Sequence, residues 1–125
     1  MTFGNGGNLL EIIGRFMVGS TFVIAGFRHM NSKTFGSLVE LLAARNIPLP
    51  RFSMGIATIF HMIAGLAFAF GIERQAAGAG LIVFAFAATV IGHNFWDKSA
   101  SDRTADLLAW QANSGIVGGI LLGMT

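Results

Sequence analysis

The sequence predicts an all-α protein, an integral membrane four-helix bundle with an interfacial amphipathic helix between its first and second spans. Only 11% of the 125 residues are charged and 54% are hydrophobic, whereas soluble domains carry about 25% charged residues. Uncharged stretches recur that could cross a bilayer core about 30 Å thick. Because hydrocarbon offers backbone polar groups no partner, such stretches are expected to be helical. The length suits one membrane domain over residues 1–125.

Four spans are predicted, at about 9–28, 52–72, 75–96 and 107–125. The first contains Glu11 and Arg15, whose spacing of four residues suits a helical ion pair that can extend toward the interface. A cleaved signal peptide is the alternative for this segment. We favour a retained span, because residues 1–8 hold no Lys or Arg and no small-residue cleavage site follows.

The first connection is expected to hold the amphipathic helix, at about 32–45. Its apolar face would consist of Phe35, Leu38, Val39 and Leu42, which follow the i, i+3, i+4, i+7 pattern. Ser37 and Glu40 have the spacing of a capping box for the last two turns. Pro48 and Pro50 should end this helix and turn the chain into the second span.

The other connections predict the orientation. Glu73 and Arg74 form a tight turn, so spans two and three should make an antiparallel hairpin. Trp96 and Trp110 flank the third connection, as interfacial anchors do. The positive-inside rule then places connections one and three in the cytoplasm and both termini outside a bacterial-type plasma membrane. The basic residues of these connections are Arg28, Lys33, Arg45, Arg51, Lys98 and Arg103.

Two classes of function are excluded by composition. The absence of cysteine removes disulfide exchange, thiol nucleophiles and Cys-ligated zinc, haem or iron–sulfur centres. A net charge of +2 with scattered basic residues gives no patch for nucleic acid. The lipid bilayer is the expected surrounding.

Three histidines in or beside the spans are the candidate site residues, because polar side chains within a membrane are costly. Thr89, His93 and Asp97 are spaced by four and would share one helical face. Asp97 could then fix the tautomer of His93 at a proton-accepting or quinone-carbonyl site, unless His93 simply bonds to a neighbouring helix or headgroup. His61 would lie near mid-membrane, either as a quinone or proton site or in a structural inter-helix hydrogen bond. His29 and His93 are the pair expected at one depth, as a bis-histidine haem would require.

Small residues recur at helix-packing spacing on two spans. They are Gly115, Gly119 and Gly123 on the fourth span, and Ala76, Gly80, Ala88 and Gly92 on the third. These stripes could serve packing within the bundle or docking against another membrane subunit.

Several short motifs follow one another along the chain. They are Gly14-Arg15-Phe16 leading to Ala25-Gly26, Ala44 to Pro50 with Ile47-Pro48-Leu49-Pro50, Gly65, Gly71 and Arg74 to Ala77, and His93-Asn94-Phe95-Trp96 followed by Arg103, Asn113, Gly118 and Gly119. In order and spacing, nearly the whole chain resembles the DoxX family of small four-span membrane proteins. The chain departs from the family's usual Lys at His29, preceded by Arg28, and from its usual Glu at His61.

The resemblance implies a plasma-membrane protein linked to redox systems, such as quinone-coupled thiosulfate oxidation or membrane oxidoreductase complexes. One hypothesis is an accessory subunit that stabilises a larger redox or energy-transducing complex. It is favoured because the chain has no cysteine, cofactor motif or soluble catalytic domain. The other is a quinone-reactive oxidoreductase component, with His61, His93 and Asp97 around the quinone. A small-molecule carrier is a third possibility, although the usual internal repeat is missing.

Overall fold

The computed structural model describes residues 8–125, and every element in that part of the chain is helical. The elements are α1 (Leu9–His29), α2 (Ser32–Ala44), α3 (Pro50–Ala69), α4 (Arg74–Gly92), the 3-10 helix η2 (Phe95–Asp97) and α5 (Ala100–Gly123). The all-α fold expected from the sequence is therefore confirmed.

Within residues 8–125, three segments are long and apolar enough to cross a membrane: Leu9–His29, Pro50–Ala69 and Arg74–Asp97. They correspond to α1, α3 and α4 with η2. The fourth predicted span falls in α5, which does not meet the same measure. Its apolar sequence is interrupted by Gln111, Asn113 and Ser114.

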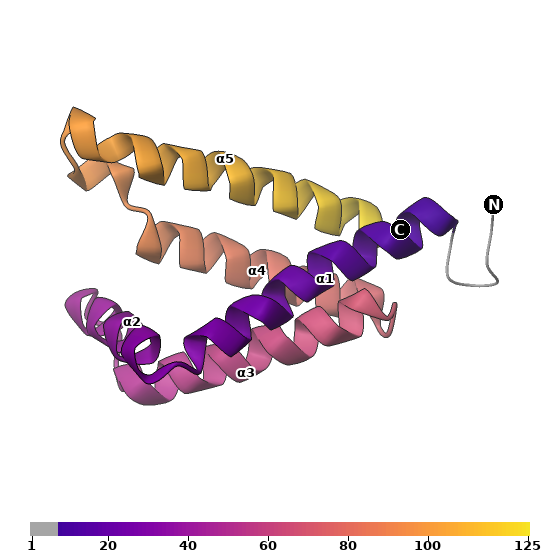
Figure 1. Ribbon diagram of the computed structural model, residues 1–125, viewed down its shortest axis with the longest axis horizontal. Helices are drawn as coiled ribbons and strands as arrows, with labels where there is room; N and C mark the ends of the chain where they lie inside the picture. Colours follow the sequence, from indigo (N-terminus) through magenta and orange to yellow (C-terminus); the bar gives the residue numbers. More distant parts are fainter. Residues whose placement is uncertain (1–7) are drawn as a thin grey trace.

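The long helices pack around one another, α1 on α3, α3 on α4, α4 on α5, and α5 on α1. Figure 1 shows the α3–α4 turn, the start of α1 and the end of α5 at one end of the molecule, with α2 and the α4–α5 corner at the other. In the α3–α4 turn, Gly71 and Glu73 both adopt positive φ, at 70° and 45°. These two residues reverse the chain, as the predicted hairpin requires.

The core lies where α1, α3, α4 and α5 meet. Phe68, Leu81 and Ile120 expose no surface at all. Large apolar side chains also face outward on every long helix, for example Leu10 at 79% and Leu122 at 72% exposure. An outer surface this apolar is expected where lipid tails, rather than water, surround the protein.

Helix α2 begins at a cap that the sequence analysis did not single out. The side chain of Asn31 accepts hydrogen bonds from the backbone N–H groups of Lys33 and Thr34. The capping box expected at Ser37 and Glu40 is wrong, since both residues lie inside α2. Asx side chains suit this position because they satisfy first-turn N–H groups that have no partner within the helix.

The proline signal after α2 is confirmed. Pro50 occupies the first turn of α3, where its missing N–H costs no hydrogen bond. Leu49 before it adopts φ 48°, which turns the chain back. The Arg51 guanidinium lies 5.6 Å from the centre of the Phe35 ring and links α3 to α2.

The glycine stripe of the fourth span is only partly a packing surface. A Cβ atom at Gly123 would lie 2.6 Å from Phe68 Cζ, and one at Gly119 would lie 3.2 Å from Val18 Cγ2. Gly115 has nothing within 4 Å, so it makes no internal contact.

The stripe expected on the third span is wrong as a single face. Ala76 and Ala88 are exposed, Gly92 has nothing within 4 Å, and Gly80 meets the Phe60 ring. The buried face of α4 instead consists of Ala77, Gly78, Leu81, Ala85 and Thr89. Small residues permit close contact between helices, but the packing of the large side chains decides which face of a helix is buried.

The closest helix approach is between α1 and α3, and the sequence analysis missed it. Gly19 and Gly65 face each other, so that a Cβ atom on Gly65 would lie 2.8 Å from the Gly19 carbonyl oxygen. Gly26 lies on the same buried face of α1, seven residues after Gly19, and a Cβ atom there would meet Met62 of α3. The spacing of seven differs from the spacing of four by which the predicted stripes were recognised.

Candidate functional site

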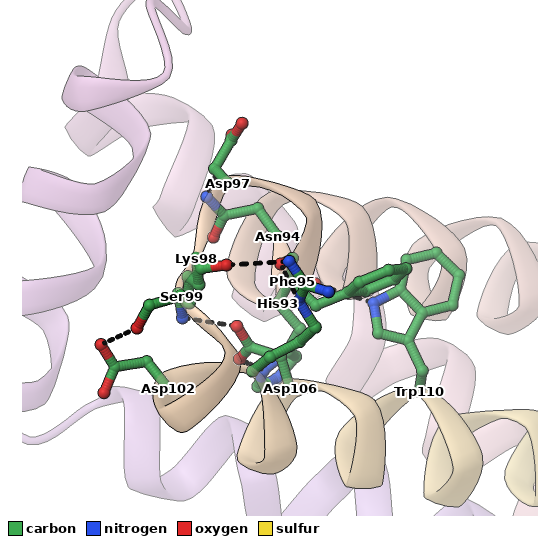
Figure 2. Close-up of polar contacts among 10 residues, drawn as sticks. His93, Asn94, Phe95, Asp97, Lys98, Ser99, Asp102, Asp106 and Trp110 are labelled. Carbon is green, nitrogen blue, oxygen red and sulfur yellow. Dashed lines mark hydrogen bonds and ion pairs between the residues drawn. The ribbon is translucent and has the colours of Figure 1, made fainter.

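The corner between α4 and α5 is organised by His93. Helix α4 ends at Gly92, and His93 leaves the helical conformation with φ −131°. Its Nδ1 lies 3.0 Å from Oδ1 of Asp106 on α5. The indole N–H of Trp110, one turn further along α5, donates to the His93 carbonyl oxygen at 2.7 Å. Figure 2 shows these side chains converging across the corner.

The carboxylate beside His93 is Asp106, which corrects the expected pairing with Asp97. Because α4 stops at Gly92, residues 94–97 do not continue its face. The Asn94 amide donates to Asp97 at 3.3 Å, and Asp97 points away from His93 in Figure 2. Asp106 follows His93 by 13 residues, and only the turn brings it back. Its place one turn before Trp110 is the one signal that could have suggested it.

Asp106 is a buried, charged partner. The Lys98 ammonium forms an ion pair with its second carboxylate oxygen. Hydrogen bonds from Lys98, and then from His93, hold the pKa of the Asp106 carboxyl below its usual value. An ionised carboxylate only accepts hydrogen bonds, so Nδ1 of His93 must carry the proton. In the neutral ring, Nε2 of His93 is then a hydrogen-bond acceptor.

Further polar contacts complete this clamp between α4 and α5. The Asn113 amide donates to the Thr89 hydroxyl at 2.7 Å, and that hydroxyl donates to the Ala85 carbonyl at 2.6 Å. Thr89 therefore serves the helix contact and not a row with His93. Arg103 donates to the carbonyls of Phe95 and Lys98, at 3.2 and 3.0 Å.

The two tryptophans lie together at this corner. Their ring centroids are 6.3 Å apart, and Phe95 packs edge-on against each. Trp96 is 49% exposed. Trp110 is part-buried and donates its hydrogen bond to His93.

A cavity of about 330 Å³ opens on the other side of His93, and His29 lines it too. Its walls are otherwise mostly apolar, with Leu38, Leu41 and Leu42 from α2, Met54 from α3, and Phe84 and Ile91 from α4. The apolar face of α2 thus closes one side. The structure brings His29, at the end of α1, and His93, at the end of α4, to one cavity.

His61 lies behind this cavity rather than in its wall. It is completely buried, with its ring centroid 5.2 Å from that of His29 and 4.3 Å from that of Phe84. Neither of its ring nitrogens meets a hydrogen-bond partner within residues 8–125, and neither does Nδ1 of His29. The inter-helix hydrogen bond expected as the structural role of His61 is not formed there.

The described residues offer little to a metal ion. In that part of the chain, no group of three or more His, Cys, Asp or Glu side chains is placed to hold one. Asp106 already engages Nδ1 of His93. The cavity beside His93 combines apolar walls with imidazole nitrogens, which is a common composition of small-molecule sites.

Helices of spanning length, an apolar outer surface and a buried polar clamp define a helical integral membrane protein. The DoxX family model matches residues 10–94, more than half of the sequence, and the chain belongs to this family. Inner membrane protein YphA of Escherichia coli (strain K12) is 27% identical over 120 residues, which cover 96% of this chain and 84% of YphA. No solved structure matches the chain.

Proposed function

We propose that this protein is a small subunit of a membrane redox complex and binds a quinone head group in the cavity between α2, α3 and α4. The observation that carries the proposal is that His29 and His93, far apart in sequence, line one otherwise apolar cavity. The chain has no cysteine and no cofactor motif, so partner subunits must supply or accept the electrons.

The chemistry of the cavity suits a quinone. Small-molecule sites measure about 300–1,000 Å³ and combine apolar walls with a few polar groups. A quinone ring is flat and apolar, with two carbonyl oxygens that accept hydrogen bonds. Neutral His93 could accept a proton at Nε2 from a quinol hydroxyl, and the protonated ring could donate one to a quinone carbonyl. Asp106 would hold His93 in place for either step.

Binding can be tested with a short-chain ubiquinone and the protein in neutral-lipid nanodiscs. Trp110 touches the His93 backbone, so its fluorescence should be quenched saturably. We expect His93→Leu to weaken binding by about tenfold or more, the value of one good hydrogen bond. His29→Leu, which leaves the α4–α5 clamp intact, should act similarly.

Asp97→Asn is the matched control, because Asp97 is exposed and makes no contact with His93. It should bind as the wild type does. Quenching that never saturates, or equal affinity in His29→Leu, His93→Leu and wild type, would contradict a quinone site here.

The topology belongs to the same proposal. With α5 as a fourth span, α2 and the α4–α5 corner would face the cytoplasm, and both termini would face outward. The six basic residues of those connections support this orientation. The similarity to YphA, an inner membrane protein, supports a bacterial plasma membrane.

A second candidate, a purely structural accessory subunit, is favoured by the outer face of α5. Gln111, Ser114 and Gly115 share this face and are exposed. Polar groups facing lipid are costly, whereas small and polar residues suit contact with another helix. Gly115→Leu should then fold normally but lose co-purifying membrane subunits. Recovery of the same partners by wild type and Gly115→Leu would exclude this face as the contact.

A further inference from the structure

A second cavity lies at the opposite end of the molecule, between the start of α1 and the α3–α4 turn. It measures about 640 Å³. Arg15 and Arg74 line it, together with Ile12, Ile13, Phe16 and Phe70. The lining contains two cations and no carboxylate among the residues that the structure describes. The proposed quinone site makes no use of it.

Arg15 is turned inward at this end. It is only 3% exposed, and its Nη1 donates to the Gly123 carbonyl at 3.4 Å. It lies six residues after the start of α1, which corresponds to about 9 Å along the helix. The sequence predicted that the Arg15 side chain extends toward the interface. In the structure it lies instead between α1 and α5.

Gly71 lies beside the guanidinium in the α3–α4 turn. Its φ is 70°, and a Cβ atom there would lie 3.6 Å from Nε of Arg15. Arg74 follows the turn as the first residue of α4, at the level where a membrane span meets the interface. The two arginines therefore direct positive charge into one cavity from a buried and a peripheral position.

The apolar side of the cavity continues onto the outer surface. Ile13, Phe16 and Phe70 are 46%, 52% and 65% exposed. A ligand could thus place an anionic group near the arginines and an apolar body against these side chains. A wholly polar anion would leave the apolar side uncovered.

We propose that this cavity binds the phosphate group of an anionic glycerophospholipid, with an acyl chain lying along Phe16 and Phe70. Guanidinium groups bind phosphate oxygens in paired, charge-assisted hydrogen bonds. Arg74 begins the segment that is long and apolar enough to span a membrane, and the apolar side of the cavity is exposed, as a lipid with its headgroup at that end would require. The ligand is a resident lipid of the outer end, independent of the quinone site.

The test measures Tm of the purified protein in a neutral detergent with three probes. These are phosphatidylglycerol, a diacylglycerol with the same acyl chains, and inorganic phosphate. A ligand that binds only the folded state stabilises it. We expect saturating phosphatidylglycerol to raise Tm by about 5 °C or more, and the other two probes to leave it unchanged.

Two variants locate the site. Arg74→Gln should abolish most of the shift, and it carries the test because Arg15→Gln alters a buried side chain and could prevent folding. Lys33→Gln changes the net charge equally on exposed α2 and should keep the full shift. An equal shift with diacylglycerol or inorganic phosphate, or an undiminished one in Arg74→Gln, would overturn the lipid-phosphate site.

Discussion

At the residue scale, the proposed quinone site depends on a carboxylate on α5 that faces a histidine at the end of α4. Asp106 is buried between Lys98 and His93 and accepts from both. Losing one member of such a group leaves the others with unpaired charge or unsatisfied donors. The trio therefore ties the α4–α5 corner together and also holds one wall of the cavity.

Asp106→Asn should destabilise the protein in a pH-dependent way. The folded-state pKa of Asp106 is lowered by Lys98 and His93, so its stabilising contribution is present above its ordinary value near 3.8. That contribution is lost as the pH falls further through the folded pKa. Thermal unfolding of both proteins at several pH values should show a difference at neutral pH that shrinks below about pH 4.

Asp97→Asn removes an equal charge from an exposed side chain and is the control. It should show neither the neutral-pH loss nor the convergence in acid. If Asp106→Asn matched Asp97→Asn across the range, the Asp106 ion pair would contribute no stability.

His61→Leu should fold at least as well as the wild type. His61 is fully buried without a hydrogen-bond partner among the described residues, and an apolar side chain of similar volume removes that penalty. We expect a change in unfolding free energy within about 1 kcal/mol, or a gain. Ubiquinone affinity should be retained, since His61 does not line the cavity.

Denaturant unfolding measures the unfolding free energy of His61→Leu, and the fluorescence titration measures its ubiquinone affinity in the same preparation. His61→Gln is the companion variant, which keeps the polar group and should be no more stable than His61→Leu. A loss of several kcal/mol in His61→Leu would instead indicate a buried water or ligand bonded to the ring.

At the element scale, a glycine in a helix does not by itself mark a contact between helices. Gly19 and Gly65 bring the backbones of α1 and α3 together, while Gly115 faces outward with nothing near it. Without a hydrophobic driving force between helices in lipid, packing at such contacts does much of the assembly.

Gly19→Leu should therefore disrupt the α1–α3 pair and reduce the folded yield. A side chain there would collide with the Gly65 carbonyl and with Ala69, and overpacking costs about 1–3 kcal/mol or more. Gly14→Leu is the matched control on the same helix, since Gly14 has nothing within 4 Å. Size-exclusion profiles in detergent compare the two, and equal monodisperse yields would contradict the packing assignment.

At the scale of the whole molecule, charge gathers toward the ends and the long sides are apolar. The corner with η2 and the segment around α2 carry most basic residues. Arg15 and Arg74 line the cavity between the start of α1 and the α3–α4 turn. The distribution of basic residues sets orientation in a membrane. The proposed quinone site and the proposed lipid site lie at the two opposite ends.

A single cysteine at Ser99 should report the orientation, because the chain has none of its own. Ser99 is exposed at the start of α5. Ser99→Cys should react with an impermeant thiol reagent only after the plasma membrane is opened, whereas Thr125→Cys should react in cells with a permeable outer membrane alone. Labelling of Ser99→Cys before opening would reverse the proposed topology.

The sequence by itself indicated the helices α1 to α5, although α5 begins at Ala100, seven residues before the predicted fourth span, and η2 was not predicted. Uncharged stretches, the paired prolines and the Glu73–Arg74 turn predicted α1 to α4 within a few residues, because these signals are local in the chain. The order and spacing of the short motifs indicated the family, which the match over residues 10–94 confirms. Length alone extended this success to α5 as a helix, although its polar residues keep it below the span measure.

Only the tertiary structure decided which side chains meet. The carboxylate beside His93 is Asp106 and not Asp97, and His29 lines the same cavity as His93. His61 lies behind that cavity. The close contact between α1 and α3 is formed by Gly19 and Gly65, which belong to neither predicted stripe. Helical periodicity relates residues within one helix, whereas these partners depend on where a helix stops and how neighbouring helices rotate. That rotation follows from the combined packing of many side chains, so no short pattern in the sequence records it.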